Sequence, residues 1–271
     1  MGQIFSDYIH ACMNFWQQQQ NYQSFAKVTN QSPSNLNDPD PGFEVAVFND
    51  PANGNTIGGL NGGKEQSGGL LIVGCNPSGV AKHRGRRTIQ NPPVSNSVRD
   101  FYLVNTYQNG TPIDSYTKTI HDFAVACGYG GNYYKMDLFG IMQKKQSVLM
   151  NDIKNRNSNN GPYYRQLFEI FVDTVISLQP EKIVFANAFV SQVVCDNSSL
   201  LVYDNANNSN YSSIRNNLVQ VRNVRNNKGG LEIRFTHAGK TLKSLAWFSS
   251  MLSGQRALDN GSKDLLIWSV R

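Results

Sequence analysis

The sequence predicts an α/β protein of three layers, with helices on both faces of a central, mostly parallel sheet of four strands. Short apolar runs bounded by turn-forming residues recur at 69–74, 133–139, 182–186 and 231–236, and such runs are typical of buried strands. Segments with helical spacing separate most of these runs. Because strands that alternate with helices favour parallel pairing, we expect one sheet covered on both sides.

The expected helices lie between and around these strands. The clearest is 162–179, where Pro162 stands at the start and apolar residues recur at helical spacing until Pro180. The other expected helices cover 5–27, 97–106, 115–128, 188–194 and a closing segment at 241–252. Shorter strands are expected at 43–48 and 218–224, and loops at 29–68 and 196–212.

The composition indicates a folded chain with a basic surplus. Of the 271 residues, 39% are hydrophobic, which is enough for a core and excludes wholesale disorder. Only 16% are charged, yet the formal net charge is +6, which favours a polyanionic partner; composition bias of the host is the alternative. We divide the chain into an N-terminal helix and Asn/Pro/Gly-rich extension, 1–67, packed on an α/β domain, 68–271.

The cysteines and the apolar runs exclude several classes of protein. Cys12, Cys75, Cys127 and Cys195 are scattered without a CxxC pair, which argues against a disulfide scaffold, a zinc site and an iron–sulfur cluster. Free, mostly buried thiols in the cytoplasm are expected instead. No apolar run is long enough to span a membrane, and no GxGxxG or Walker loop indicates a nucleotide cofactor. We therefore expect no membrane, metal or cofactor.

Polar residues stand at three of the expected strand ends. Asn76 follows the first strand, Asp137 lies in the second and His237 follows the fourth. Ligands of parallel sheets bind at the carboxyl ends of the strands, so we expect these three side chains to meet. Each has a structural alternative: Asn76 with Pro77 is a common turn, Asp137 could be a helix cap, and His237 could bond to backbone.

The run 70–79 (LLIVGCNPSG) resembles the first motif of the mismatch-specific branch of the uracil-DNA glycosylase superfamily, a strand ending in Gly-x-Asn-Pro-Gly. Ser78 before the second glycine departs from that motif. Residues 179–189 are similar to the family's central unit of proline and buried strand. Residues 236–239 fall where the family has its second motif, His-Pro-Ser or Asn-Pro-Ser, and only His237 matches it. The resemblance covers roughly 68–252.

The resemblance implies a monofunctional DNA glycosylase that flips a base and hydrolyses its N-glycosidic bond, leaving an abasic site. Asn76 would hold the attacking water, and His237 would stabilise the departing base. Base-contacting residues would include Asp137 and those around the motif and in the 97–106 segment: Cys75, Pro77, Ser78, Phe101 and Tyr102. Core packing is the alternative for the aromatic residues.

Asp137 bears on which base is removed. By resemblance the end of the second strand reads the edge of the extruded base, where uracil readers carry an asparagine. An ionised aspartate only accepts hydrogen bonds, so it suits the amino group of a cytosine. We therefore expect a modified cytosine, such as hydroxymethylcytosine or its glucosylated form, in defence against phage. Uracil or mismatch repair is the alternative, and a catalytically silent DNA-binding module on the same scaffold is another.

The basic residues gather in two places in the chain. One group follows the first motif: Lys82, Arg84, Arg86 and Arg87. Another lies between 215 and 243 and includes Lys240 and Lys243. By resemblance, the apolar wedge that enters the duplex lies a few residues past the histidine of the second motif, and Leu242 is the candidate. A solvated loop is the alternative for the charges, and a core position is the alternative for Leu242. We expect DNA as the partner and a monomeric protein.

Overall fold

A computed structural model of the chain describes residues 3–18, 42–46, 68–76, 87–89, 100–104, 107–108, 111–112, 114–141, 143, 146–155, 160–195, 201–203, 211–213, 217–252 and 257–271. Within these ranges no helix is both long and apolar enough to cross a membrane. Cys12, Cys75, Cys127 and Cys195 are all free thiols, and the first three are buried, as expected from the sequence.

A single mixed sheet of six strands forms the centre of the fold, in the order β11-β12-β13-β8-β2-β7. Its strands in chain order are β2 (Leu70–Gly74), β7 (Tyr133–Asp137), β8 (Lys182–Ala186), β11 (Val219–Arg225), β12 (Leu231–His237) and β13 (Lys240–Ser249). Strands β13, β8, β2 and β7 run parallel to one another, whereas β12 is antiparallel to both β11 and β13. The α/β class is confirmed, but the sheet has six strands and is mixed.

The helix expected at 241–252 was wrong, because this segment is β13. Its side chains alternate between the two faces of the sheet. Leu242 and Ala246 pack into one hydrophobic cluster, whereas Leu245 and Trp247 pack into the other. From Leu245 onward β13 is apolar on both faces and shows no polar alternation, so the pattern of the segment is easily read as helical. The run 231–236 is a strand as expected, but it is antiparallel.

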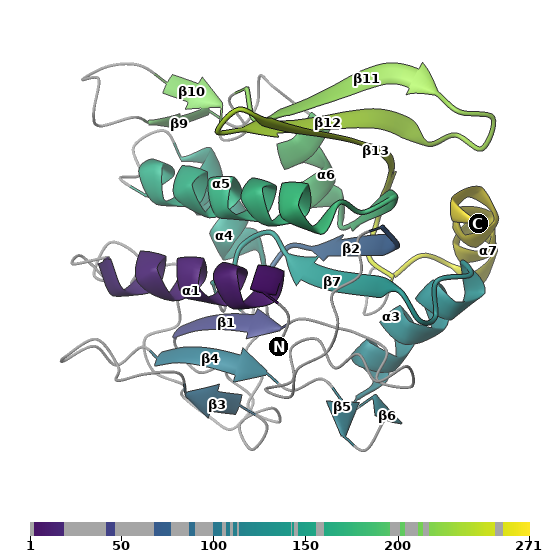
Figure 1. The fold of residues 1–271 in the computed structure, drawn as a ribbon, viewed down its shortest axis with the longest axis horizontal. Helices are drawn as coiled ribbons and strands as arrows, with labels where there is room; N and C mark the ends of the chain where they lie inside the picture. Colours follow the sequence, from purple (N-terminus) through teal and green to yellow (C-terminus); the bar gives the residue numbers. More distant parts are fainter. Residues whose placement is uncertain are drawn as a thin grey trace.

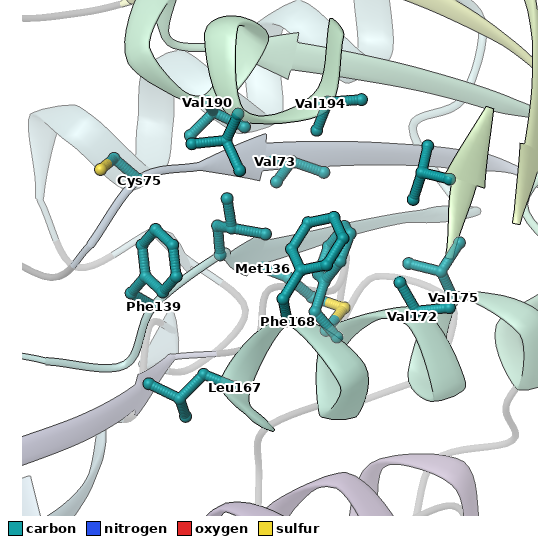
Figure 2. Packing of buried hydrophobic residues seen from close by; sticks show 14 of the residues in the cluster. Val73, Cys75, Met136, Phe139, Leu167, Phe168, Val172, Val175, Val190 and Val194 are labelled. Atoms are coloured by element: carbon teal, nitrogen blue, oxygen red, sulfur yellow. The ribbon is translucent and has the colours of Figure 1, made fainter. Parts of the chain in front are cut away.

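Helices cover both faces of the sheet. The face that carries Leu71 and Val73 packs against α1 (Gln3–Gln18), α4 (Gln146–Lys154), α5 (Gly161–Leu178) and α6 (Ala188–Cys195). Figure 1 shows α1 and α5 side by side, and Figure 2 shows side chains of β2, β7, α5 and α6 meeting in this cluster. The opposite face, with Leu70 and Ile72, packs against α3 (Ser115–Ala126) and α7 (Asn260–Val270).

Among the residues that the structure describes, short strands form three smaller sheets. The largest has the order β1-β4-β3, from β1 (Gly42–Ala46), β3 (Arg87–Ile89) and β4 (Asp100–Val104), and β1 lies beside β7 (Figure 1). The helix expected at 97–106 was therefore wrong: its FYLV run of aromatic and branched residues favours a strand. The other two pair β5 (Tyr107–Gln108) with β6 (Thr111–Pro112), and β9 (Leu201–Tyr203) with β10 (Tyr211–Ser213), within the loop expected at 196–212.

Candidate functional site at the carboxyl edge of the sheet

The order of the parallel strands places a topological switch point between β2 and β8. From β2 the chain passes to β7 on one side, and it returns later to β8 on the other side. The strand ends on either side of such a point diverge and form the crevice where α/β proteins bind ligands. Asn76 follows β2, Asn187 follows β8, and Asp137 ends the adjacent strand β7.

The side chain of Asn76 is fixed by backbone on one side. Its Nδ2 donates to the carbonyl oxygens of Ile141, at 3.3 Å, and Gln143, at 3.0 Å. Only the nitrogen of an amide can donate, so these contacts determine which way the group points. The Oδ1 lies on the other side of the amide and is its acceptor atom.

A second pair of amides lies on the α4 side of the edge. Gln146 Nε2 donates to Asn187 Oδ1 at 2.9 Å, and Asn187 Nδ2 donates to Gln146 Oε1 at 3.3 Å. The same Asn187 oxygen accepts the backbone N–H of Phe189 and so caps α6. Burial raises the pKa of the Cys75 thiol, and the charge of Asp137 raises it further. Cys75 therefore remains a neutral thiol near pH 7 and is a poor nucleophile.

A buried ion pair lies on the α3 side of the edge. Lys135 and Asp137 are two residues apart on β7, point to the same face and form a salt bridge, with side chains only 3% and 10% exposed. The Lys135 ammonium also lies 5.7 Å from the centre of the Tyr116 ring. Gly74 makes room for the pair, because a Cβ there would lie 2.3 Å from Asp137 Oδ1. Asp137 is thus paired with a cation and does not act as an isolated acceptor.

The structure does not bring His237 to Asn76, so the predicted catalytic pair is wrong in its geometry. His237 ends β12, which runs antiparallel, and it pairs with Lys240, the first residue of β13. It therefore lies at the opposite edge of the sheet. Its Nδ1 is 2.5 Å from Asp173 Oδ1 on α5, which accounts for this side chain structurally.

The other residues predicted to contact DNA near His237 lie at the same edge of the sheet as His237, opposite the edge that carries Asn76. Lys240 and Lys243 are exposed on the outer part of β13. Leu242 packs against the large hydrophobic cluster, which corrects its assignment as a wedge. None of the three is near the switch point, because β13 reaches its pairing with β8 only at Leu245.

Several predicted residues cannot be placed with their side chains. Pro77, Ser78, Lys82, Arg84 and Arg86 lie outside the described residues. Of the remaining three, the backbone alone is described: Arg87 begins β3, while Phe101 and Tyr102 belong to β4. Their predicted contacts with base or phosphate remain predictions.

Sequence reasoning missed Lys135, Gln146 and Asn187. Asn187 could have been found, because it follows the strand 182–186 as directly as Asn76 follows 70–74. Lys135 carries a usable signal too, since a lysine inside an otherwise apolar parallel strand needs a buried partner. Nothing in the sequence around Gln146 distinguishes it from an exposed helix residue.

Comparison of the chain with protein-family models, with curated proteins and with solved structures finds no match in any of the three. The function therefore has to be inferred from the site itself.

Proposed function

We propose that this protein is a DNA glycosylase that hydrolyses the N-glycosidic bond of a base held at the carboxyl edge between β2 and β8. The observation that carries the proposal is the Asn76 amide at the switch point, oriented by two backbone carbonyls. Hydrolysis needs a water held beneath the sugar, and an amide oxygen orients water without deprotonating it. The resemblance of 70–79 to the first glycosylase motif supports the same role.

Charge on the departing base requires a group other than His237, which lies at the far edge. Lys135 lies near the carboxyl end of β7, on the strand that pairs with β2. A fixed cation beside the base would stabilise the negative charge that develops as the bond breaks. We therefore assign this role to Lys135, with Asp137 holding its ammonium in place.

The ion pair also determines which bases the site can contact. Cytosine offers a donor at N4 and an acceptor at N3, whereas uracil offers a donor at N3 and an acceptor at O4. Asp137 supplies the acceptor and Lys135 supplies the donor, so the pair matches either edge. The proposed substrate is a pyrimidine in DNA, with modified cytosine as the candidate that the carboxylate suggests.

Excision from duplex oligonucleotides tests both parts of the proposal. Each duplex carries one uracil, mismatched thymine, cytosine, hydroxymethylcytosine or glucosylated hydroxymethylcytosine, and alkaline cleavage reveals abasic sites. We expect strand breaks with at least one pyrimidine and none with normal cytosine. Binding to every duplex without any abasic site would instead identify a silent DNA-binding module.

Asn76→Ala should lower the single-turnover excision rate by about 10²-fold or more, the scale of losing a positioned catalytic group. Asn226→Ala is the matched control: Asn226 Oδ1 also fixes two backbone groups, the N–H of Lys228 and of Gly230, but it lies in the β11–β12 turn. Both variants should keep the wild-type circular dichroism spectrum. His237→Ala should stay within about threefold of wild type, because its side chain is at the far edge.

Equal losses in Asn76→Ala and Asn226→Ala would mean that the amide acts only through folding. A large loss in His237→Ala with intact folding would contradict the geometry given above.

A further inference from the structure

Strands β11, β12 and β13 form an antiparallel meander at the end of the sheet farthest from β7 (Figure 1). One face of the meander is covered: Val219, Ile233, Phe235 and Leu242 pack in the cluster with α5. The intervening residues point to the other face, because side chains alternate along a strand. We call this the polar face, and it consists of Gln220, Arg222, Glu232, Arg234, Thr236, Thr241 and Lys243.

The register sets two cations of the polar face against each other. Arg234 on β12 is directly opposite Lys243 on β13, with Gln220 on the other side of Arg234. Directly opposed like charges destabilise an antiparallel pair. The Arg234 Nε is also covered from solvent and has no hydrogen-bond partner among the residues that the structure describes. The opposition of these two cations therefore destabilises the fold. It also leaves the Arg234 Nε–H without an acceptor among the described residues.

The nearby charges do not compensate this pair. Glu232 contacts Arg222, whose Nε lies 3.5 Å from the Glu232 Oε1, one row further along the same face. The described polar face thus holds three cations and one carboxylate, and in the register that carboxylate lies opposite Arg222 and Leu245 and not opposite Lys243. An anionic ligand lying across the strands would relieve the repulsion between Arg234 and Lys243.

We propose that the polar face of the meander binds the phosphate backbone of a nucleic acid, with Arg234 and Lys243 as the central contacts. Arg, Lys, Gln and Thr are the side chains that contact phosphate and sugar. The polar face offers these groups, and Leu245, the next residue on this face of β13, packs into the second hydrophobic cluster instead of standing free to enter lipid, which distinguishes the face from a membrane-binding surface.

This surface is separate from the carboxyl edge. Lys243 lies six residues before Ser249, which ends β13, and this corresponds to roughly 20 Å along the strand. The inference therefore does not depend on glycosylase activity, and its test requires no catalysis.

The test measures binding of a labelled duplex and of the same single strand over a range of salt concentrations. The double variant Arg234→Gln with Lys243→Gln is compared with Lys118→Gln plus Lys263→Gln, which removes two charges from α3 and α7. We expect the first variant to bind more weakly and to flatten the slope of log K against log[salt] by about 1.8 on duplex DNA, or about 1.4 on single strands. The control should keep the wild-type slope.

A folding measurement accompanies the binding data. Removing the opposed charges should leave the urea midpoint of the first variant unchanged or higher. A lower midpoint would show that the two residues serve the fold, and equal binding losses in both double variants would show that only net charge matters; either result overturns the proposal. So would unchanged nucleic-acid binding, or binding to anionic vesicles that depends on Arg234 and Lys243.

Discussion

At the scale of single residues, the buried ion pair of Lys135 and Asp137 is the main determinant of the charge at the candidate site. Taking two charges out of water costs several kcal/mol for each ion, and their attraction offsets this only while both partners are present. The pair lies on a parallel strand beneath α3, with Gly74 of the neighbouring strand leaving space for the carboxylate. The pair therefore lies at the carboxyl edge, within the site proposed above to hold the base.

Asp137→Asn should therefore lower the free energy of unfolding by about 3–5 kcal/mol, because it leaves a buried ammonium without a counter-charge. Replacing both residues, Lys135→Met with Asp137→Asn, should recover much of this loss. Asp122→Asn provides the matched control: Asp122 pairs with Lys118 in the exposed first turns of α3, where an ion pair is worth about 0–1 kcal/mol. Urea unfolding of the four proteins measures this, and equal effects of the two single substitutions would contradict it.

At the scale of elements, the turn between β12 and β13 explains why 236–239 is not a catalytic motif. Ala238 and Gly239 form a two-residue hairpin loop, both with positive φ, at +47° and +76°. Two positive φ angles match a hairpin turn whose twist fits that of its strands, and the residues that favour it are Asn and Gly. The segment therefore folds as a tight turn that leads from β12 into β13.

Ala238 holds a left-handed conformation that costs an alanine roughly 1–2 kcal/mol. Ala238→Asn should raise the free energy of unfolding by about 0.5–1 kcal/mol, because asparagine tolerates this conformation. Gly239→Ala should lower it by about 1 kcal/mol for the converse reason. Chemical denaturation detects both shifts, and a destabilised Ala238→Asn would contradict the turn geometry.

Elements whose apolar runs end at clear turn or proline signals were predictable from the sequence. The helix 162–179 became α5, and the strand 182–186 became β8 with the same bounds. Segment 241–252 was misassigned because its apolar residues include those at 242, 245, 246 and 248, a spacing that fits a helix as well as a strand whose one face changes from exposed to buried along its length. The direction of β12 was equally hidden, because the short connection at 238–239 was read as a binding motif. That one error also moved His237 to the wrong edge.

At the scale of the whole molecule, two hydrophobic clusters hold helices on both faces of one sheet, and the N-terminal helix α1 belongs to the larger cluster. The thiols are distributed through this interior: Cys12 on α1, Cys75 after β2 and Cys127 after α3. Burial raises the pKa of Cys12 and of Cys127 to about 12, and it raises that of Cys75 as well. The buried thiols of the folded protein therefore keep their protons at pH values at which the same thiols of the unfolded chain are already ionised.

Alkaline conditions should destabilise the protein for this reason. Above about pH 9 the unfolded chain loses its thiol protons, whereas the folded chain keeps them until about pH 12. The unfolded state then binds fewer protons, so the free energy of unfolding falls as pH rises, by about 1.4 kcal/mol per buried thiol for each pH unit. Urea unfolding in reductant at several pH values between about 8 and about 10, below the pH at which the tyrosines of the unfolded chain ionise, measures the slope. Cys127→Ala should reduce this slope by about a third, whereas Cys195→Ala, at an exposed thiol, should leave it unchanged. A free energy of unfolding that stays constant up to about pH 10 would contradict the burial of these thiols.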